Sequence, residues 1–471
     1  MSGGPALCRR ETIVKLTLPT LFALLVLAGP SAQAVDLLDA LRAAEQHDPE
    51  FAGARAQAEA GRTRSRQGKA LSAPQLNATM GAGYLDQQTQ TRGAAFSAPG
   101  VGSAAGAAFD TSLNGGTSAR WALNARQSLY DPELSASARQ LERGATVAEA
   151  QFALARQELV LRVSHSYFDV LAAEEAVALA ARQKAAARHA LEEATERFDA
   201  GDTPVTDKRE AQARLDAISA QELATQSDLD LKRAAFTDLT RLPAGDLARL
   251  ASTQALAVVE PEPLANWIAR AAERSPLIAL QRLGAENAGD EIEKYRALTS
   301  PKVDLVAQVG VDRAHGGGDF GYAQSASSMR AVGIQVSIPL FTGGMRDAKR
   351  DEAVALAERA RADLARTRQI VERQTRAAWT AVRVGTAQVR AYEQALVSAK
   401  SRLDATELGV EAGGRTMLDL LDAQTAFHAA DSTWTRARYE WLLGRIRLAA
   451  AAGEAGEETI QTAASVLGRP R

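Results

Sequence analysis

Two aspartates three residues apart, Asp419 and Asp422, are the acidic pair in the sequence most suggestive of a function. On a helix this spacing places both carboxylates on one face, where they would attract cations and raise one another's pKa values. A purely structural role is also open to them. Thr416 and Asp419 have the spacing of a capping box, and the helix dipole favours an Asp in the first turn. From these residues alone the capping role is favoured, although the two roles are compatible.

The sequence lacks the residue patterns of an enzyme active site. Its single cysteine is Cys8, and its five histidines show no metal-ligand spacing. It contains no P-loop and no G-x-S-x-G motif. We therefore expect no catalytic residues, no metal site and no cofactor. With 55 Lys and Arg against 57 Asp and Glu, the near balance of charge argues against a nucleic-acid partner.

Residues 1–34 have the pattern of a secretory signal peptide. Arg9, Arg10 and Lys15 precede an apolar run over 16–29, and residues 32–34 read Ala-Gln-Ala, as at a cleavage site. The run is short for a membrane span. No later segment offers eighteen consecutive apolar residues. We expect the exported chain either to stay soluble or to enter a membrane as a β-barrel.

The rest of the chain reads as a duplicated unit. Pro49 and Pro276 are 227 residues apart, as are five other matched pairs. Leu129 and Leu340 are only 211 apart, so one loop has changed length while the flanking elements kept theirs. The expected domains are a first repeat (35–262), a second repeat (263–452) and a polar, loosely ordered C-terminal tail (453–471).

Each repeat is expected to hold two helices, a β-hairpin and a long helical hairpin. Asp48-Pro49 and Ser275-Pro276 have the signature of a helix start. Apolar and polar residues then alternate in strands of about ten residues. The loops between them, 86–118 and 312–330, are rich in small residues and are predicted to be mobile tips. The β-hairpins are expected over about 75–130 and 302–341, and the helical hairpins over about 133–241 and 345–452.

The helical hairpins are the longest predicted elements. No proline occurs over 133–199 or 345–411, and apolar residues there step by three and four, as in a coiled coil. About 67 residues of helix would extend about 100 Å. Glycine-containing turns at 200–202 and 412–414 reverse the chain.

Four strands per chain cannot close a barrel, and lipid does not tolerate open sheet edges. Several chains would therefore have to share one barrel if these strands span a membrane. Trp121 on the apolar face, with Arg120 and Arg126 on the polar face, suits a barrel with a wet lumen. The alternative is a soluble β-sandwich cap on a coiled coil. The secretory signal and the clean alternation favour the barrel.

The turns of the two helical hairpins, and the segment at the end of the last predicted strand, resemble those of a known family. Residues 197–207 read RFDAGDTPVTD, residues 413–424 read GGRTMLDLLDAQ, and residues 337–345 read SIPLFTGGM. In this order and spacing they resemble the TolC family of trimeric outer-membrane export ducts, from about Leu37 to Gly453. The resemblance implies a mainly α fold with a β-barrel part. Three chains would form a homotrimer, with a 12-stranded barrel in the outer membrane of a Gram-negative bacterium and an α-helical tunnel reaching far into the periplasm.

The resemblance also implies roles for residues near the turns. Asp419 and Asp422 match acidic residues that line the periplasmic entrance, and a trimer would gather six such charges there. Arg415 matches a basic residue that helps hold the entrance closed, and Asp207 matches its acidic partner. Val410 stands where the family's best-studied member has an aromatic hydroxyl, so we expect a weaker or differently built lock.

The expected function is that of a passive exit duct. Its implied partners are outer-membrane lipid, a periplasmic adaptor, and an inner-membrane ABC transporter or other pump. No lipid-acceptor cysteine follows the signal, which favours type I secretion of a polypeptide, such as a toxin or hydrolase, over multidrug efflux. A soluble periplasmic coiled-coil adaptor or scaffold is the remaining alternative.

Overall fold

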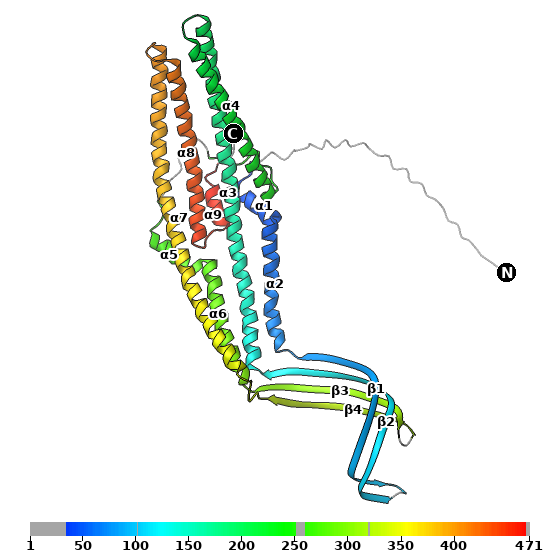
Figure 1. The fold of residues 1–471 in the computed structure, drawn as a ribbon. Coiled ribbons are helices and arrows are strands. Elements are labelled where there is room, and N and C mark those ends of the chain that lie inside the picture. The colour runs from blue at the N-terminus through cyan, green and yellow to red at the C-terminus, as the bar shows by residue number, and fades with distance from the viewer. Residues whose placement is uncertain (1–33, 101, 251–259, 319–320, 468–471) are drawn as a thin grey trace, which may run out of the picture.

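The chain forms a long helical bundle with a four-stranded sheet at one end (Figure 1). This computed structural model describes residues 34–100, 102–250, 260–318 and 321–467. The expected signal peptide, apart from Ala34, lies outside the described residues. None of the described helices is long and apolar enough to cross a membrane.

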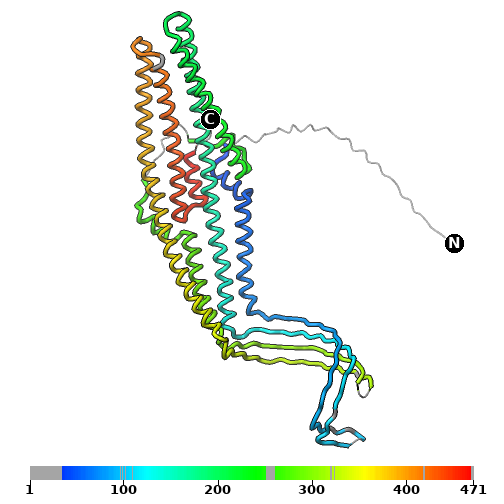
Figure 2. The backbone as a smooth tube through the Cα atoms, in the orientation of Figure 1, coloured from blue at the N-terminus to red at the C-terminus, as the bar shows by residue number. Residues whose placement is uncertain are grey.

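Both halves of the chain follow the same order of elements. Two helices lead into a β-hairpin, which is followed by a very long helix and a return helix. The two helical hairpins run along the bundle with their turns at the same end (Figure 2). The elements are α1 (Leu37–His47), α2 (Pro49–Leu71), β1 (Gln75–Ala98), β2 (Gly102–Tyr130), α3 (Pro132–Asp199), α4 (Val205–Thr240), α5 (Leu264–Arg274), α6 (Pro276–Arg296), the 3-10 turn η1 (Ala297–Thr299), β3 (Lys302–Gly318), β4 (Gly321–Ser337), α7 (Met345–Glu411), α8 (Met417–Ala451) and α9 (Glu457–Ala464).

The helices begin and end close to the predicted positions. Asp48 caps α2 by accepting a 3.1 Å hydrogen bond from the Phe51 N–H. Ser275 precedes α6 in the equivalent place, but its side chain makes no capping hydrogen bond. The proline-free runs form α3 and α7 over 68 and 67 residues. The fold is thus mainly helical with an antiparallel sheet, as expected.

The sheet has the strand order β1-β2-β3-β4, and every pairing is antiparallel. Met80 lies opposite Trp121, which lies opposite Val311. This register gathers the alternating residues into an apolar face and a polar face. The apolar face includes Leu76, Met80, Tyr84, Trp121, Leu123, Val309, Val311, Val332 and Ile334. The polar face includes Asn77, Thr79, Arg120, Asn124, Arg126, Asp304, Gln308, Asp312 and Gln335.

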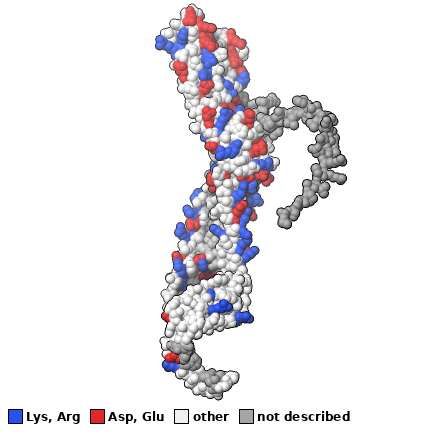
Figure 3. Space-filling view, turned by 90° about the vertical axis from the view of Figure 1, so that its right-hand side faces the viewer, with Lys and Arg blue, Asp and Glu red and all other residues white. Residues whose placement is uncertain are grey.

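Two ion pairs cross the polar face between β2 and β3. The Arg120 Nε lies 2.8 Å from Asp312, and an Arg126 Nη atom lies 2.6 Å from Asp304. On the side of the molecule shown in Figure 3, charged residues are spread along the helices and are sparse over the sheet. Four charged side chains of the sheet, Arg120, Arg126, Asp304 and Asp312, are thus paired on its polar face.

The prediction that 86–118 and 312–330 are loops is wrong for most of their length. β1 and β2 have 24 and 29 residues and remain paired as far as Ala98 opposite Gly102. Small residues hide the alternating pattern, but their backbones can still form a ladder. The longer first hairpin accounts for the change of offset between the repeats. Its outer part extends past β3 and β4 and bends away from them (Figure 1).

The predicted loosely ordered tail is also wrong over 457–464. These residues form α9, in which Ile460 is fully buried and Ala463 and Ala464 are nearly so. Glu457 also forms an ion pair with Arg42 of α1. One apolar stripe on a short helix is enough to fix the segment against the bundle.

The main buried apolar cluster lies midway along the bundle, where the short helices α1 and α9 join α3, α4, α7 and α8. Tyr167 of α3 is fully buried there, and its hydroxyl lies 3.0 Å from the Val35 carbonyl and 2.9 Å from the Ala248 carbonyl. Burial raises the pKa of this hydroxyl far above its usual value. Glu174, also buried, accepts hydrogen bonds from Arg233 and Arg249 at 2.7 Å each. These contacts fasten the end of α4 and the following loop to α3.

Gly61 and Gly53 of α2 allow a matched test of how closely α2 packs on α3. A Cβ atom at Gly61 would lie 2.1 Å from the Ala148 Cβ. We expect Gly61→Ala to destabilise the protein by about 1–3 kcal/mol through overpacking. A Cβ at Gly53 meets nothing within 4 Å, so Gly53→Ala should stabilise it by about 0.5–1 kcal/mol. Thermal unfolding followed by circular dichroism checks this, and equal shifts in Tm for the two variants would refute the close approach.

Candidate functional site at the hairpin turns

The residues predicted to form an entrance all lie near the two helical turns. Asp207 is in the first turn of α4, and Arg415 lies just before α8. Asp419 and Asp422 follow in the first two turns of α8. The two turns are neighbours at the end of the bundle farthest from the sheet (Figure 1).

Both turns close with the same pattern of backbone hydrogen bonds. Gly201 and Gly413 have φ values of +81° and +72°, which favour glycine. The Asp202 N–H donates to the Arg197 carbonyl, and the Gly414 N–H donates to the Gly409 carbonyl. This is the Schellman ending of a helix. It holds the start of each return helix in a defined place beside the helix before it.

The predicted capping box at the start of α8 is present. The Thr416 N–H donates to Asp419 at 3.0 Å, and the Asp419 N–H donates to the Thr416 hydroxyl oxygen at 3.1 Å. The backbone hydrogen bond lowers the pKa of Asp419 most, and the Thr416 hydroxyl and the Arg415 charge lower it further. The Asp419 side chain is partly exposed, so the cap keeps a charged carboxylate at the surface of the turn.

An ion pair that the sequence analysis missed links the two hairpins. An Arg214 Nη atom of α4 lies 2.7 Å from an Asp422 carboxylate oxygen of α8. Their side chains are 36% and 50% exposed, so each partner retains contact with water. The available signal was the position of Arg214 on α4, two helical turns after Asp207 and therefore on the same face. Its partner could be found only from the packing of the two hairpins.

The expected pairing of Arg415 with Asp207 is absent from the described part of the chain. Asp207 instead lies 3.2 Å from the hydroxyl of its neighbour Thr206. The aliphatic stem of Arg415 crosses α7 at Gly409, where an added Cβ would meet the Arg415 Cγ at 2.7 Å. A glycine at 409 therefore lets the Arg415 stem lie close against α7, another feature that the sequence analysis missed.

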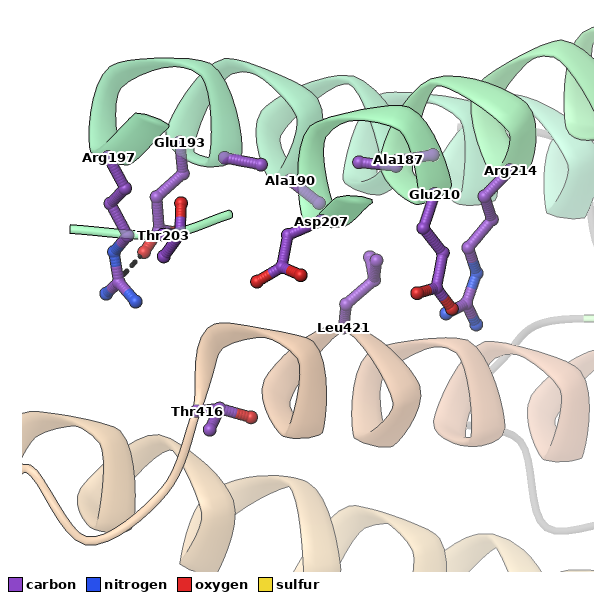
Figure 4. A pocket seen from close by; sticks show the side chains of 12 residues that line it. Ala187, Ala190, Glu193, Arg197, Thr203, Asp207, Glu210, Arg214, Thr416 and Leu421 are labelled. Carbon is purple, nitrogen blue, oxygen red and sulfur yellow. Dashed lines mark ion pairs between the residues drawn. The ribbon is translucent and has the colours of Figure 1, made fainter. Parts of the chain in front are cut away.

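A hollow of about 370 Å³ separates the hairpins beside the Arg214–Asp422 pair. Asp207, Glu210 and Arg214 point from α4 toward α8, which contributes Leu421 (Figure 4). Small alanine side chains of α3 and α4 form much of its wall. The hairpins are thus loosely packed at this end. No group of His, Cys, Asp and Glu side chains in the described ranges is arranged to hold a metal ion.

Comparisons with known proteins match this arrangement. The chain matches the family described as "Outer membrane efflux protein" over residues 40–240 and 267–454. It is 30% identical to the alkaline protease secretion protein AprF of Pseudomonas aeruginosa, covering 94% of this chain and 89% of that one. It is 28% identical to the proteases secretion protein PrtF of Dickeya chrysanthemi, covering 94% of each. It is 29% identical to the outer membrane protein TolC of Vibrio cholerae, covering 72% of this chain and 77% of that one.

A solved structure shares the fold. The outer membrane protein VceC of Vibrio cholerae aligns with a TM-score of 0.68 at 18% identity, covering 88% of this chain and 96% of that chain. At this identity the likeness supports the arrangement of helices and strands.

The Arg214–Asp422 link can be tested by measuring the distance between the two turns. Spin labels on Asp202→Cys and Glu411→Cys, with labelled chains diluted into unlabelled protein, report that distance by pulsed EPR. We expect Arg214→Ala and Asp422→Ala each to broaden the distribution, because each removes the ion pair. The double variant should broaden it no further, since both changes remove the same contact.

Arg209→Ala is the matched control, because Arg209 lies on α4 and is exposed. It should leave the distance distribution unchanged. Additive broadening in the double variant would show that Arg214 and Asp422 act independently.

Proposed function

Because the chain belongs to the outer membrane efflux protein family, we propose that it is the exit duct of a type I secretion system. It is an outer-membrane export channel and not an enzyme. The proposed passenger class rests on the share of this chain that each relative matches. AprF and PrtF, both named for protease secretion, match over 94% of this chain, whereas TolC matches over 72%. The passenger would be a polypeptide such as a toxin or hydrolase.

Small-molecule efflux is the second candidate, and the family description supports it directly. In either case the energy would come from an inner-membrane pump, an ABC transporter in type I secretion, acting through a periplasmic adaptor. The protein itself would supply a passage across the outer membrane.

The sheet supports a shared barrel in a homotrimer. Within the described chain β1 and β4 each keep one unpaired edge. Pairing β4 of one copy with β1 of the next would satisfy these edges, and three copies would give twelve strands. The apolar face would contact lipid, and the polar face with its Arg–Asp pairs would line a wet lumen.

The helices support the same assembly. Several apolar residues on α4 and α7 are exposed in the single chain, among them Leu223, Leu231, Val397 and Leu408, at 66–73% for the leucines and 56% for the valine. In a trimer, neighbouring helical hairpins would cover such residues and continue the barrel as a tunnel. The repeats 35–262 and 263–452 would contribute equivalent hairpins to it.

The turns would form the entrance of this tunnel. Asp419 and Asp422 would line it, with Arg415 and Asp207 nearby. A half-exposed ion pair such as Arg214–Asp422 contributes about 0.2–1 kcal/mol. Three symmetric copies would hold the entrance closed, yet a docking adaptor could separate them. Separation would release the carboxylate of Asp422 from its arginine, so opening would also make the entrance more negative.

Single-channel recording in planar bilayers tests the pore and its entrance together. We expect small, cation-selective currents that divalent or trivalent cations block, because carboxylates bind those ions. Asp419→Ala/Asp422→Ala should lose most of the block while still inserting. Asp216→Ala, on the exposed side of α4, is a control that should keep it. Failure of the wild type to insert would overturn the barrel.

The pH dependence of the block follows from the capping box. The pKa of Asp419 is lowered, so its carboxylate is charged at neutral pH and becomes protonated only as the pH falls through this lowered value. Thr416→Ala removes one hydrogen bond to the carboxylate and should move the acid loss of the block to higher pH. An unchanged pH profile would show that the Asp419 carboxylate does not take part in the cation block.

The passenger class is tested in cells that lack the protein. We expect one or a few polypeptides to disappear from the culture medium and to return on complementation, with little change in sensitivity to antibiotics. Complementation with Gly53→Ala serves as a control for expression. A normal set of secreted proteins combined with strong antibiotic sensitivity would instead favour efflux.

A further inference from the structure

The helices nearest the sheet form a layer whose two edges differ from its middle. In this layer α6 packs against both α3 and α7, whereas α2 packs extensively only against α3 among the described helices. Figure 1 shows α2 and α7 on opposite sides of α3 and α6. The second helix of the second repeat thus has two long neighbours, and the second helix of the first repeat has one. A further copy of the chain could supply the missing neighbour by placing its α7 against α2.

The pairing of the strands shows how the residues of the two repeats correspond. Gln75 of β1 lies opposite Arg126 of β2. The residues 227 and 211 positions later, Lys302 of β3 and Ser337 of β4, also lie opposite each other. The two β-hairpins therefore have the same register once each strand is shifted by its own constant number of residues.

The same two shifts relate the helices next to the sheet. A Cβ atom at Gly68 of α2 would lie 2.9 Å from the Ala138 carbonyl oxygen of α3. Tyr295 of α6 comes 227 positions after Gly68, and it interacts electrostatically with Lys349 of α7, which comes 211 positions after Ala138. The packing of α2 on α3 is thus repeated in the packing of α6 on α7.

Polar contacts join α3 to α6 within the chain. The Gln140 side-chain amide donates a 2.5 Å hydrogen bond to Glu291, and an Arg143 Nη atom lies 3.2 Å from the buried Asp290. Glu291 also interacts electrostatically with Lys349, so it lies between α3 and α7. If the repeats pack alike, this contact shows which residues α7 of one copy would bring to α2 of another.

The equivalent positions on α2 and α7 are complementary in charge. Those that correspond to the hydrogen-bonded pair are Arg64 of α2 and Asp351 of α7, which carry opposite charges. Those that correspond to the ion pair are Thr63 and Val354, which are both uncharged. A second copy placed by the repeat would therefore bring together one pair of opposite charges and one neutral pair.

Arg64 and Asp351 are both free to make such a contact. The Asp351 side chain is 71% exposed, and its ion pair is with its own neighbour Arg350. Arg64 is exposed and is in no ion pair with another described residue. Its stem lies along α3 at Gly144, where an added Cβ would lie 3.0 Å from the Arg64 Cδ. The guanidinium therefore lies beside α3, as Glu291 does in the second repeat.

We propose that Arg64 of one copy forms an ion pair with Asp351 of the next copy, and that α2 and α7 pack against each other around this pair. This inference rests on the homotrimer of the proposed function. Each copy would use α2 toward one neighbour and α7 toward the other, so three equivalent contacts would close a ring. The ring would lie in the part of the helices next to the sheet, far from the entrance at the turns.

The test measures the equilibrium between trimer and monomer by native mass spectrometry of the purified full chain, diluted in detergent. We expect Arg64→Glu to raise the dissociation constant of the trimer about 100-fold, because three contacts each weaken by about fivefold. Asp351→Arg should act in the same direction. Arg64→Glu/Asp351→Arg should recover most of the loss, since the two charges are exchanged.

Arg66→Glu is the matched control and should behave as wild type. Arg66 is exposed on α2, two positions from Arg64 and therefore on another face of the helix. Its equivalent in the second repeat, Glu293, forms an ion pair with Arg296 and not with α3.

The outcomes separate this contact from the proposed function. A wild type that stays monomeric would overturn the homotrimer and the contact with it. A trimeric wild type that the single reversals do not weaken would overturn the contact alone, as would a double reversal that recovers nothing. If a reversal variant does not fold, Arg64→Gln and Asp351→Asn decide. Each should weaken the trimer about 10-fold, at about twofold per contact, and together they should weaken it no further.

Discussion

The unpaired backbone edges of β1 and β4 are the constraint on which the rest of the structure depends. Each buried N–H or C=O group without a partner costs several kcal/mol in lipid, so a four-stranded sheet cannot stay open there. The sheet has one apolar face, one polar face and two outer edges, and further copies of the chain would pair those edges in the proposed barrel. In the helical part, apolar residues on α4 and α7 are exposed in the single chain, and neighbouring copies would cover them. Both the sheet and the helices of the protomer therefore favour the proposed assembly.

Packing strength varies along the molecule in a way that suits a gated duct. The middle is held by a wide core and by buried polar contacts such as those of Tyr167 and Glu174. At the turns, a hollow and one half-exposed ion pair separate the hairpins. Val410 cannot supply the hydroxyl that the family resemblance suggested, and Arg214 provides a polar link at another position. In the proposed duct, a firmly packed middle and a weakly held end would allow the turns to move while the strands stay in place.

Much of this arrangement could be predicted from local signals. Proline-free runs defined α3 and α7 almost to the residue, and the spacing of Thr416 and Asp419 identified the capping box. The length of β1 and β2 was missed because small residues carry no alternating pattern, although their backbones pair. The order of α9 was missed because its polar composition concealed Ile460. Arg214–Asp422 joins residues 208 positions apart, so only the packing of the hairpins could reveal it.

Disulfide cross-linking between the outer strands tests the shared barrel most directly. Leu76→Cys on β1 would be combined in turn with cysteines at Val332, Ile334 and Val336 on β4, all on the apolar face. Within one chain these strands lie at opposite edges of the sheet and cannot be bridged. The account predicts covalent dimers and trimers for at least one pairing, and none for the single-cysteine chains. Monomers alone in every pairing, from protein that inserts into membranes, would contradict it.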